Sequence, residues 1–183
     1  MYAIVDIEST GSPVSTNGIT EIAIVLHNGQ EVEGYYETLI NPEVEIPPYV
    51  VRLTSITNEM VATAPLFKDV AEQIHTLLKG RTFVAHNVDF DYNYLKYFLE
   101  KNGYNYNEKR LCTFKLSKKA FPNLPKHGLG SLSVELNIQL ENHHRAGADA
   151  MATTKIFDMI LKNGGARLIN SMIENGTSKR KKK

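Results

Sequence analysis

The chain has 183 residues, of which 42% are apolar and 22% charged, and these values fit one globular domain with a sizeable core. Its formal net charge is +1, but residues 179–183 are all basic; without them 16 basic residues face 20 acidic ones, a balance of −4. This excludes a strongly basic protein that grips long duplexes through phosphates, and no apolar run approaches the ~20 residues of a membrane-spanning helix.

The N-terminus and the cysteine content bear on the location of the protein. The chain begins Met-Tyr-Ala-Ile-Val-Asp, which lacks the basic region and cleavage site of a secretory signal. Its single cysteine, Cys112, cannot form a disulfide within the chain. We therefore expect a cytoplasmic protein without membrane association, in which Cys112 is a small buried side chain.

The first part of the chain has the pattern of an antiparallel meander. Residues 2–8 predict a buried strand with acids on one face, and after a polar loop residues 20–27 and 31–40 predict two more strands. Residues 27–30, His-Asn-Gly-Gln, predict a tight hairpin between these two, because Asn-Gly supplies the positive φ angles that such turns need.

Helices and strands alternate in the rest of the chain. Apolar spacing and breaker residues predict helices at 49–53, 58–61, 66–79, 89–101, 114–120, 129–136 and 147–161, and short strands at 81–86 and 111–113. A meander followed by alternating helices and strands indicates an α/β fold, a mixed sheet flanked by helices.

Two acids interrupt the apolar first strand. Asp6 and Glu8 are two residues apart, so their side chains point to the same face. Burying two neighbouring carboxylates is unfavourable unless a divalent cation neutralises them. The alternative, that this face is exposed to solvent at the end of the sheet, stays open from this pair alone.

A second polar group lies where a strand is expected to end and a helix to begin. Residues 86–91 read His-Asn-Val-Asp-Phe-Asp. Strand ends of open α/β sheets are common positions for sites. Asp89 also fits a helix N-cap, and Asp91 would be stabilised by the helix dipole with or without a metal.

The third group precedes the last long helix. Residues 144–149 read His-Arg-Ala-Gly-Ala-Asp, which places His144 in a loop and Asp149 in the first helical turn. A histidine in such a loop suits proton abstraction from water near neutral pH. The spacing alone is a weak signal, since His143 lies beside it.

The three groups together indicate metal chemistry. Hard oxygen ligands without cysteine favour Mg²⁺ or Mn²⁺ over a structural zinc. Several acids around two such ions suit in-line attack on a phosphodiester.

At these residues the sequence resembles the DEDDh exonucleases, a family that includes the proofreading subunit of bacterial DNA polymerase III. Residues 6–11, Asp-Ile-Glu-Ser-Thr-Gly, resemble the first motif, with serine where threonine is commoner. Residues 86–91 match the second motif, His-Asn-x-x-Phe-Asp, which selects Asp91. Residues 144–149 match the third, His-x4-Asp, which selects His144.

The resemblance implies a ribonuclease H-like mixed five-stranded sheet. The expected exonuclease domain covers 1–163, and a C-terminal helical extension and a basic tail are expected over 164–183; the run of basic residues indicates that the tail is disordered. The expected activity is metal-dependent 3′→5′ hydrolysis of single-stranded DNA to 5′-mononucleotides, with two divalent ions, Mg²⁺ or Mn²⁺. A polymerase, helicase or other nuclease subunit is the expected kind of protein partner.

The resemblance also implies the roles of the site residues. The catalytic set is Asp6, Glu8, Asp91, His144 and Asp149. The four acids would hold the metal ions, and the histidine would deprotonate the attacking water.

A pocket for the 3′-terminal nucleotide is implied as well. Its expected residues are Thr10, Gly11, Leu53, Ile56 and His86. Leu53 and Ile56 have ordinary core packing as an alternative. Ser55 replaces the glycine usual in this segment, which puts the local backbone shape in question.

Two other functions remain as alternatives. One is the same chemistry on short RNA, because the sequence does not show what surrounds a 2′-hydroxyl. The other is a non-catalytic nucleic-acid-binding adaptor, which is disfavoured because all five catalytic positions are present.

Overall fold

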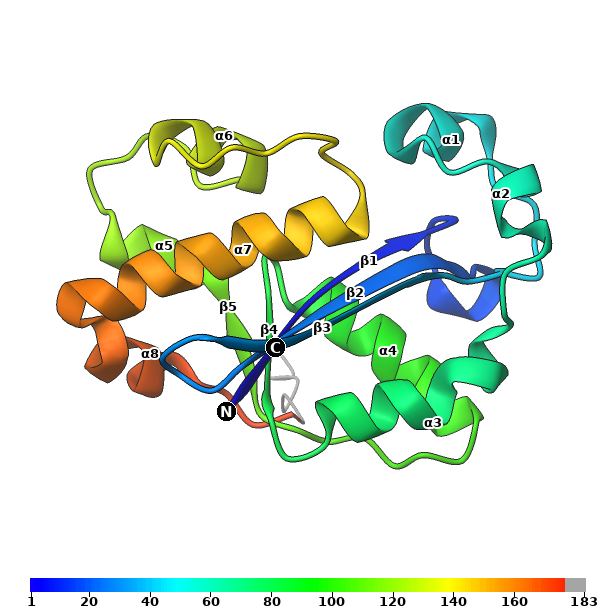
Figure 1. Cartoon of the computed structure of the whole chain (residues 1–183), viewed down its shortest axis with the longest axis horizontal. Helices are drawn as coiled ribbons and strands as arrows, with labels where there is room; N and C mark the ends of the chain where they lie inside the picture. Colours follow the sequence, from blue (N-terminus) through cyan, green and yellow to red (C-terminus); the bar gives the residue numbers. More distant parts are fainter. Residues whose placement is uncertain (177–183) are drawn as a thin grey trace, which may run out of the picture.

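A mixed β-sheet between two layers of helices forms the centre of the computed structural model, which describes residues 1–176 (Figure 1). Within these residues the sheet has five strands: β1 (Tyr2–Ser9), β2 (Ile19–His27), β3 (Val32–Leu39), β4 (Thr82–Ala85) and β5 (Arg110–Cys112). Their order is β3-β2-β1-β4-β5. The β1–β2 and β2–β3 pairs are antiparallel, and β4 runs parallel to both β1 and β5. The predicted mixed five-stranded sheet is therefore confirmed.

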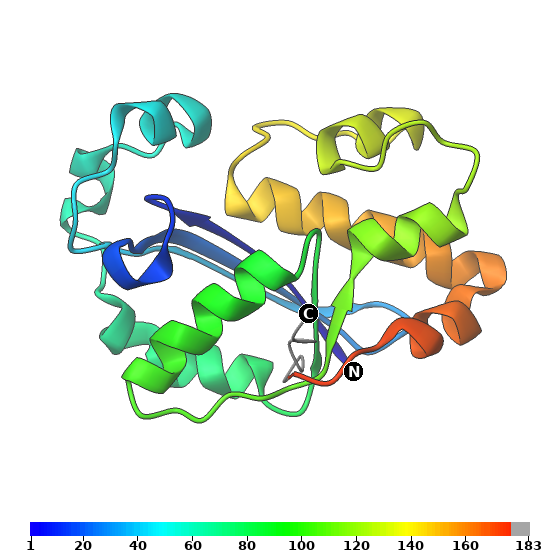
Figure 2. The same cartoon turned by 180° about the vertical axis from the view of Figure 1, so that it is seen from behind.

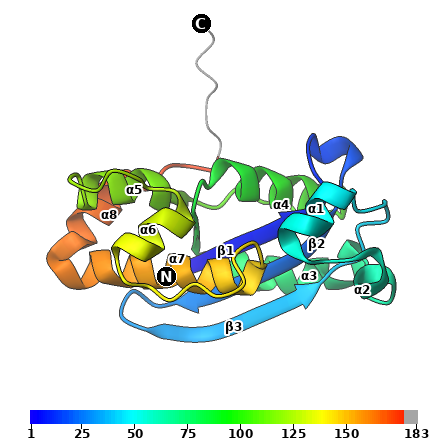
Figure 3. The ribbon, with the colours of Figure 1, turned by 90° about the horizontal axis from the view of Figure 1, so that it is seen from above.

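Helices cover both faces of this sheet. They are α1 (Pro48–Thr54), α2 (Asn58–Ala62), α3 (Phe67–Leu78), α4 (Asp89–Lys101), α5 (Thr113–Ala120), α6 (Leu129–Glu135), α7 (Ala146–Ile160) and α8 (Ala166–Met172). Helices α3 and α4 lie on one face, whereas α5 and α7 lie on the other (Figures 1 and 2). Helix α6 lies beside α7, and α1 lies towards the opposite end of the molecule (Figure 3).

Strand β1 separates two hydrophobic cores and thereby places the acids. Val5 and Ile7 belong to the core beneath α3 and α4, whereas Ile4 belongs to the core beneath α7. Because side chains alternate along a strand, Asp6 and Glu8 share the α7 side. The apolar core thus ends where the carboxylates begin.

The predicted helices and strands agree with the observed ones to within one residue at each end. The hairpin prediction was wrong in detail. Only Gly29 has a positive φ angle in this turn, 99°. The Asn28 side chain instead accepts hydrogen bonds from the backbone N–H groups of Gln30 and Glu31, at 2.8 and 3.0 Å. The loop is stabilised by this side chain, so Asn28 needs no left-handed backbone.

The C-terminal part of the described chain packs onto the same body. Helix α7 continues through a π-helical turn, Leu161–Gly165, into α8, where Ile169 is buried. Glu174 then pairs with Arg110 of β5 through two backbone hydrogen bonds of 2.9 Å. The expected division at residue 163 falls inside the π-helical turn and stays a prediction. The basic residues 179–183 lie outside the described residues.

Over residues 1–176, none of the helices combines the length and the apolar character needed to cross a lipid bilayer.

Candidate active site

One strand, two helix starts and one loop bring the predicted catalytic residues into one cleft. Asp6 and Glu8 come from β1, Asp91 from the first turn of α4, and Asp149 from the first turn of α7. His144 lies in the loop that enters α7. All five line an open cleft of about 240 Å³.

Three carboxylates lie within the range of one metal ion. Asp6, Glu8 and Asp149 each offer an oxygen, and these oxygens lie within 4.8 Å of one another. The side chains come from sequence positions more than 140 residues apart, so the grouping depends on the packing of α7 over β1. Asp6 and Glu8 are half-buried and face Asp149, so they are not simply a solvent-exposed pair at the end of the sheet.

Asp91 reaches the cluster from the first turn of α4. It is 5% exposed, and its Oδ1 accepts a hydrogen bond of 3.1 Å from the backbone N–H of Ile7. Asp89, two residues earlier, points away and forms an ion pair of 2.8 Å with Arg110. The structure thus separates the two acids as the motif did: Asp91 enters the cleft and Asp89 does not line it.

The cluster carries more negative charge than its surroundings neutralise. Burial, and then repulsion by Asp91 and Asp149, raises the pKa of Asp6 well above its usual range. Burial, and then repulsion by Asp149 and Glu21, raises the pKa of Glu8 to about 8. Burial raises the pKa of Asp91 to about 7, against the lowering effect of the Ile7 hydrogen bond. Such a site takes up either protons or cations.

Two histidines stand at the edge of the cluster. The rings of His143 and His144 stack with centroids 3.8 Å apart. The Nδ1 of His143 lies 2.9 Å from Asp149 Oδ1, whereas His144 contacts this carboxylate only through its backbone N–H, at 3.3 Å. Burial and the adjacent His143 lower the pKa of His144. Its ring is therefore neutral near pH 7, as a proton acceptor must be.

Of the two apolar residues predicted to line the nucleotide pocket, one is exposed and one is buried. Leu53 on α1 is 51% exposed, so its side chain is free to touch a base. Ile56 is fully buried in a cluster with Ile46, Val50 and Val61, which corresponds to the core-packing alternative. Its predicted base contact conflicts with this burial, because a completely covered side chain offers no surface to a ligand.

Ser55, at the family's glycine position, adopts the backbone that a glycine would supply. Its φ angle is 60°, and its N–H caps the end of α1 by donating to the Val51 carbonyl at 2.8 Å. The doubt about the local backbone shape is thereby answered, since the left-handed cap is retained with serine.

Thr10 and Gly11 form the turn that follows β1. The Thr10 hydroxyl donates to Asn17 Oδ1 at 2.9 Å and accepts from the Gly18 N–H at 3.0 Å. Gly11 has a φ angle of 141°, and its carbonyl accepts a hydrogen bond from the Tyr94 hydroxyl. These groups shape the loop, and their contact with a nucleotide stays a prediction.

His86 lines the cleft, but both nitrogens of its ring already have partners. Nε2 lies 2.7 Å from the His127 carbonyl, which can only accept, so Nε2 carries the proton. Nδ1 lies 3.0 Å from the Thr113 hydroxyl, and burial lowers the pKa of the ring. The Thr113 hydroxyl has a single proton and also lies 3.1 Å from the Ala85 carbonyl, so it donates either to that carbonyl or to Nδ1 of a neutral His86. The predicted contact of His86 with the terminal nucleotide would require one of these bonds to open.

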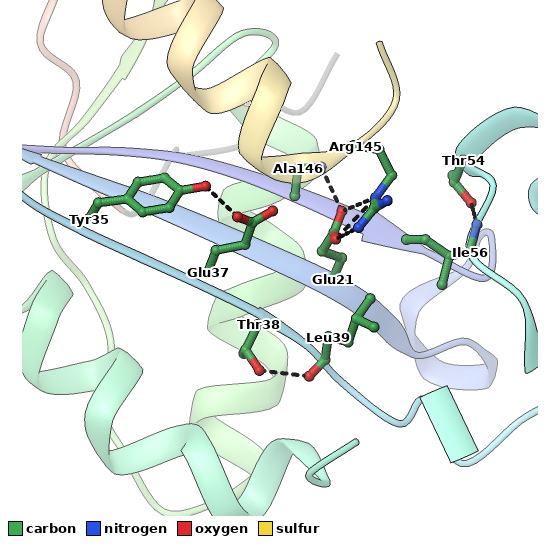
Figure 4. Close-up of polar contacts among 9 residues, drawn as sticks. All are labelled: Glu21, Tyr35, Glu37, Thr38, Leu39, Thr54, Ile56, Arg145 and Ala146. Carbon is green, nitrogen blue, oxygen red and sulfur yellow. Dashed lines mark hydrogen bonds and ion pairs between the residues drawn. The ribbon is translucent and has the colours of Figure 1, made fainter. Parts of the chain in front are cut away.

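An ion pair with one buried member lies beside the cleft and was not predicted from the sequence. Glu21 of β2 is 1% exposed and binds Arg145, the residue after His144 (Figure 4). The signal was present, because Glu21 interrupts an apolar strand just as Asp6 and Glu8 do. The pairing itself joins residues 124 positions apart and follows only from the fold.

Comparisons with known proteins agree with this geometry. The RNase_T family model, described as exonuclease, matches residues 3–157. The protein named 3′-5′ exonuclease DinG from Staphylococcus epidermidis is 39% identical over 156 residues, which are 85% of this chain and 17% of that protein. The protein of the same name from Staphylococcus aureus strain MRSA252 is 38% identical over the same shares. The chain thus spans about a sixth of the length of these relatives.

Solved structures share the fold. Exonuclease X in complex with 5′ overhanging duplex DNA superposes with a TM-score of 0.75 and 26% identity, over 94% of this chain and 99% of that one. Escherichia coli exonuclease I in complex with a dT13 oligonucleotide gives a TM-score of 0.80 at 21% identity, over 93% of this chain and 42% of that one. The second likeness concerns the fold alone.

Proposed function

The chain belongs to the RNase_T exonuclease family, and from this premise we propose that it is a metal-dependent 3′→5′ exonuclease that hydrolyses single-stranded DNA to 5′-mononucleotides. The observation that carries the proposal is the convergence of Asp6, Glu8 and Asp149, whose oxygens lie within 4.8 Å of one another. Asp91 and His144 line the same cleft, which supports the proposal that these five residues act together.

The donor set fits two hard divalent cations, Mg²⁺ or Mn²⁺. All four acids offer carboxylate oxygens, which these ions prefer. The raised pKa values of Glu8 and Asp91 reflect negative charge that a cation would neutralise. Asp6, Glu8 and Asp149 would hold one ion, and Asp6 with Asp91 the other. Bound ions would supply Lewis acidity and charge neutralisation at the phosphate.

His144 acts as the base in this proposal. Its neutral ring takes a proton from the attacking water, whose oxygen forms a bond to the phosphorus of the terminal nucleotide. The bond between that phosphorus and the 3′-oxygen of the preceding nucleotide breaks. The 3′-oxygen takes a proton, so the products are a 5′-mononucleotide and a strand with a new 3′-hydroxyl. Leu53, which is exposed on α1, would contact the terminal base.

DNA is the favoured substrate because a structural neighbour was solved with it. Exonuclease X was solved with DNA, and it matches this chain over nearly all of both lengths. The same chemistry on short RNA is the alternative. Initial rates on a DNA and an RNA oligonucleotide of equal sequence distinguish the two, since only the 2′-hydroxyl differs.

A non-catalytic adaptor is the alternative of another class. It would not need five catalytic side chains in one cleft. Mn²⁺ that raises the melting temperature of wild type but not of Asp6→Ala would argue against an adaptor that has lost its metal site.

We expect weak intrinsic affinity for nucleic acid. Residues 1–178 carry a formal charge of −4, so few phosphates are neutralised without metal ions. A polymerase, helicase or further nuclease segment would deliver the substrate, and a cytoplasmic location fits this role. A steep fall of affinity with salt, which indicates many phosphate contacts, would contradict the expectation.

The direct test uses a 5′-labelled single-stranded DNA oligonucleotide with Mg²⁺ or Mn²⁺. A ladder that shortens from the 3′ end, absent with EDTA and with Asp6→Ala, is the expected result. An oligonucleotide that stays intact, while a matched RNA is shortened, moves the proposal to RNA. If both strands stay intact, the proposed activity is wrong for this chain.

A further inference from the structure

Glu21 is a buried acid for which the proposed chemistry has no use. It lies on β2 directly opposite Glu8 of β1 in the antiparallel register, on the face that α7 covers. Its side chain is 1% exposed. A buried carboxylate beside other carboxylates destabilises a fold unless it is fully paired. The partners that compensate the charge of Glu21 therefore indicate its role.

Every strong contact of Glu21 goes to the loop that enters α7 (Figure 4). Arg145 donates from Nε to both carboxylate oxygens, at 3.1 and 3.0 Å, and from Nη2 to Oε1 at 2.5 Å. The backbone N–H of Ala146 donates to Oε2 at 2.8 Å. Each oxygen thus accepts two hydrogen bonds, which leaves Glu21 little capacity to bind a metal ion.

Arg145 and Ala146, the two residues that Glu21 binds, lie between His144 and Asp149 in the sequence. Arg145 follows His144 directly, and its carbonyl accepts the first helical hydrogen bond of α7, from the Asp149 N–H at 3.0 Å. Asn142 and His144 both have left-handed backbones, with φ angles of 56° and 68°. Non-glycine residues adopt this region only where the surroundings hold them there. The hydrogen bonds of Glu21 fix Arg145, the residue directly after His144.

The same contact fixes α7 to the strand pair. Glu21 is adjacent to Glu8, and Ala146 is three residues before Asp149. The hydrogen bond between Glu21 and Ala146 therefore links the strand that carries Glu8 to the helix that carries Asp149. A shift of the α7 start would separate Asp149 from Asp6 and Glu8.

We propose that Glu21 and Arg145 are positioning residues that hold the His144 loop and the first turn of α7, so that His144 and Asp149 face Asp6 and Glu8. This inference rests on the proposed function, and it assigns the ion pair no contact with metal or substrate. Arg145 also compensates the charge of Glu21, so its loss would leave an unpaired carboxylate beside the metal ligands.

Glu21→Gln is the central variant, because it keeps the volume and one acceptor for the Ala146 N–H but loses the second acceptor for Arg145. Arg145→Lys keeps the charge but not the planar fork. Glu37→Gln is the matched control. Glu37 lies on the neighbouring strand β3, close to the start of α7, and its Oε2 accepts from the Tyr35 hydroxyl at 2.6 Å (Figure 4).

The experiment measures kcat and KM on a DNA oligonucleotide well below the melting temperature of each variant. It also measures the Mn²⁺ dependence of the melting temperature, which needs no activity. We expect Glu21→Gln and Arg145→Lys to lower kcat about 10- to 100-fold with little change in KM, and to weaken Mn²⁺ binding. Glu37→Gln should resemble wild type in both measurements.

Three results would overturn the inference. A lower melting temperature with wild-type kcat and Mn²⁺ binding would mean that the pair only stabilises the fold. A raised KM at unchanged kcat would mean that Arg145 binds substrate. Equal losses in Glu37→Gln would mean a general charge effect. If wild type is inactive, the proposed function fails, whereas the comparison of Mn²⁺ binding still decides on the positioning role. If Glu21→Gln does not fold, Arg145→Lys provides the same readouts.

Discussion

The Nδ1 atom of His143 lies 2.9 Å from Oδ1 of Asp149, and the His143 ring stacks on that of His144. His143 therefore occupies an oxygen of Asp149 that a metal ion would need, while the His144 ring stays beside it in the cleft. Metal binding and the His143 hydrogen bond compete for the same carboxylate, and this competition gives the two adjacent histidines different roles.

His144→Ala should lower kcat about 100- to 10,000-fold, because it removes the base that accepts the proton from water. His143→Ala should lower kcat less than about tenfold, since its bond to Asp149 is lost anyway when a cation binds. Steady-state rates with Mn²⁺ on a DNA oligonucleotide measure both. The reverse order of effects would transfer the role of base to His143.

The metal-free protein should become less stable as pH rises through neutrality. The folded-state pKa of Glu8 is about 8, above its ordinary value of 4.5, so the fold favours the protonated form. Below pH 4.5 folded and unfolded chains are both protonated, and this residue costs no stability. Between pH 4.5 and about 8 only the unfolded chain ionises freely, so the free energy of unfolding declines across this window.

Thermal unfolding in EDTA from pH 5 to 8 measures this decline. Mn²⁺ should raise the melting temperature more at pH 8 than at pH 5, because deprotonated carboxylates bind it. Glu8→Gln should flatten the pH dependence in EDTA. A wild-type melting temperature that rises steadily towards pH 8 in EDTA would contradict the charge balance assigned to the cluster.

Ser55→Gly should stabilise the fold by about 0.5–1 kcal/mol, because glycine adopts the left-handed cap without the steric cost that a side chain brings. The φ angle of Ser55 is 60°. Urea unfolding measures the change, and Ser55→Ala serves as the control, since alanine keeps the Cβ and should give no gain. A destabilised glycine variant would show that the serine side chain contributes more than the backbone strain costs.

The sequence predicted the strands and helices well because their apolar periodicities are local properties of the chain. Asp6 and Glu8 were recognisable because acids in an apolar strand need an explanation. The burial of Ile56 and the exposure of Leu53 were not predictable, since both are apolar and only the packing of α1 and of the turn that follows it distinguishes them. The ring partners of His86 and the Glu21–Arg145 pair also depend on how distant segments pack. Local patterns do not contain that information.

One comparison tests the central claim most directly: release of mononucleotides from a 3′-labelled single-stranded DNA with Mn²⁺ by wild type, Asp91→Asn and Asp89→Asn. Both acids lie in the first turn of α4, but Asp91 lines the cleft while Asp89 pairs with Arg110 outside it. The four-carboxylate site predicts release by wild type and by Asp89→Asn, and a loss of about 100-fold or more in Asp91→Asn. Release by Asp91→Asn at the wild-type rate, or no release by wild type, would contradict it.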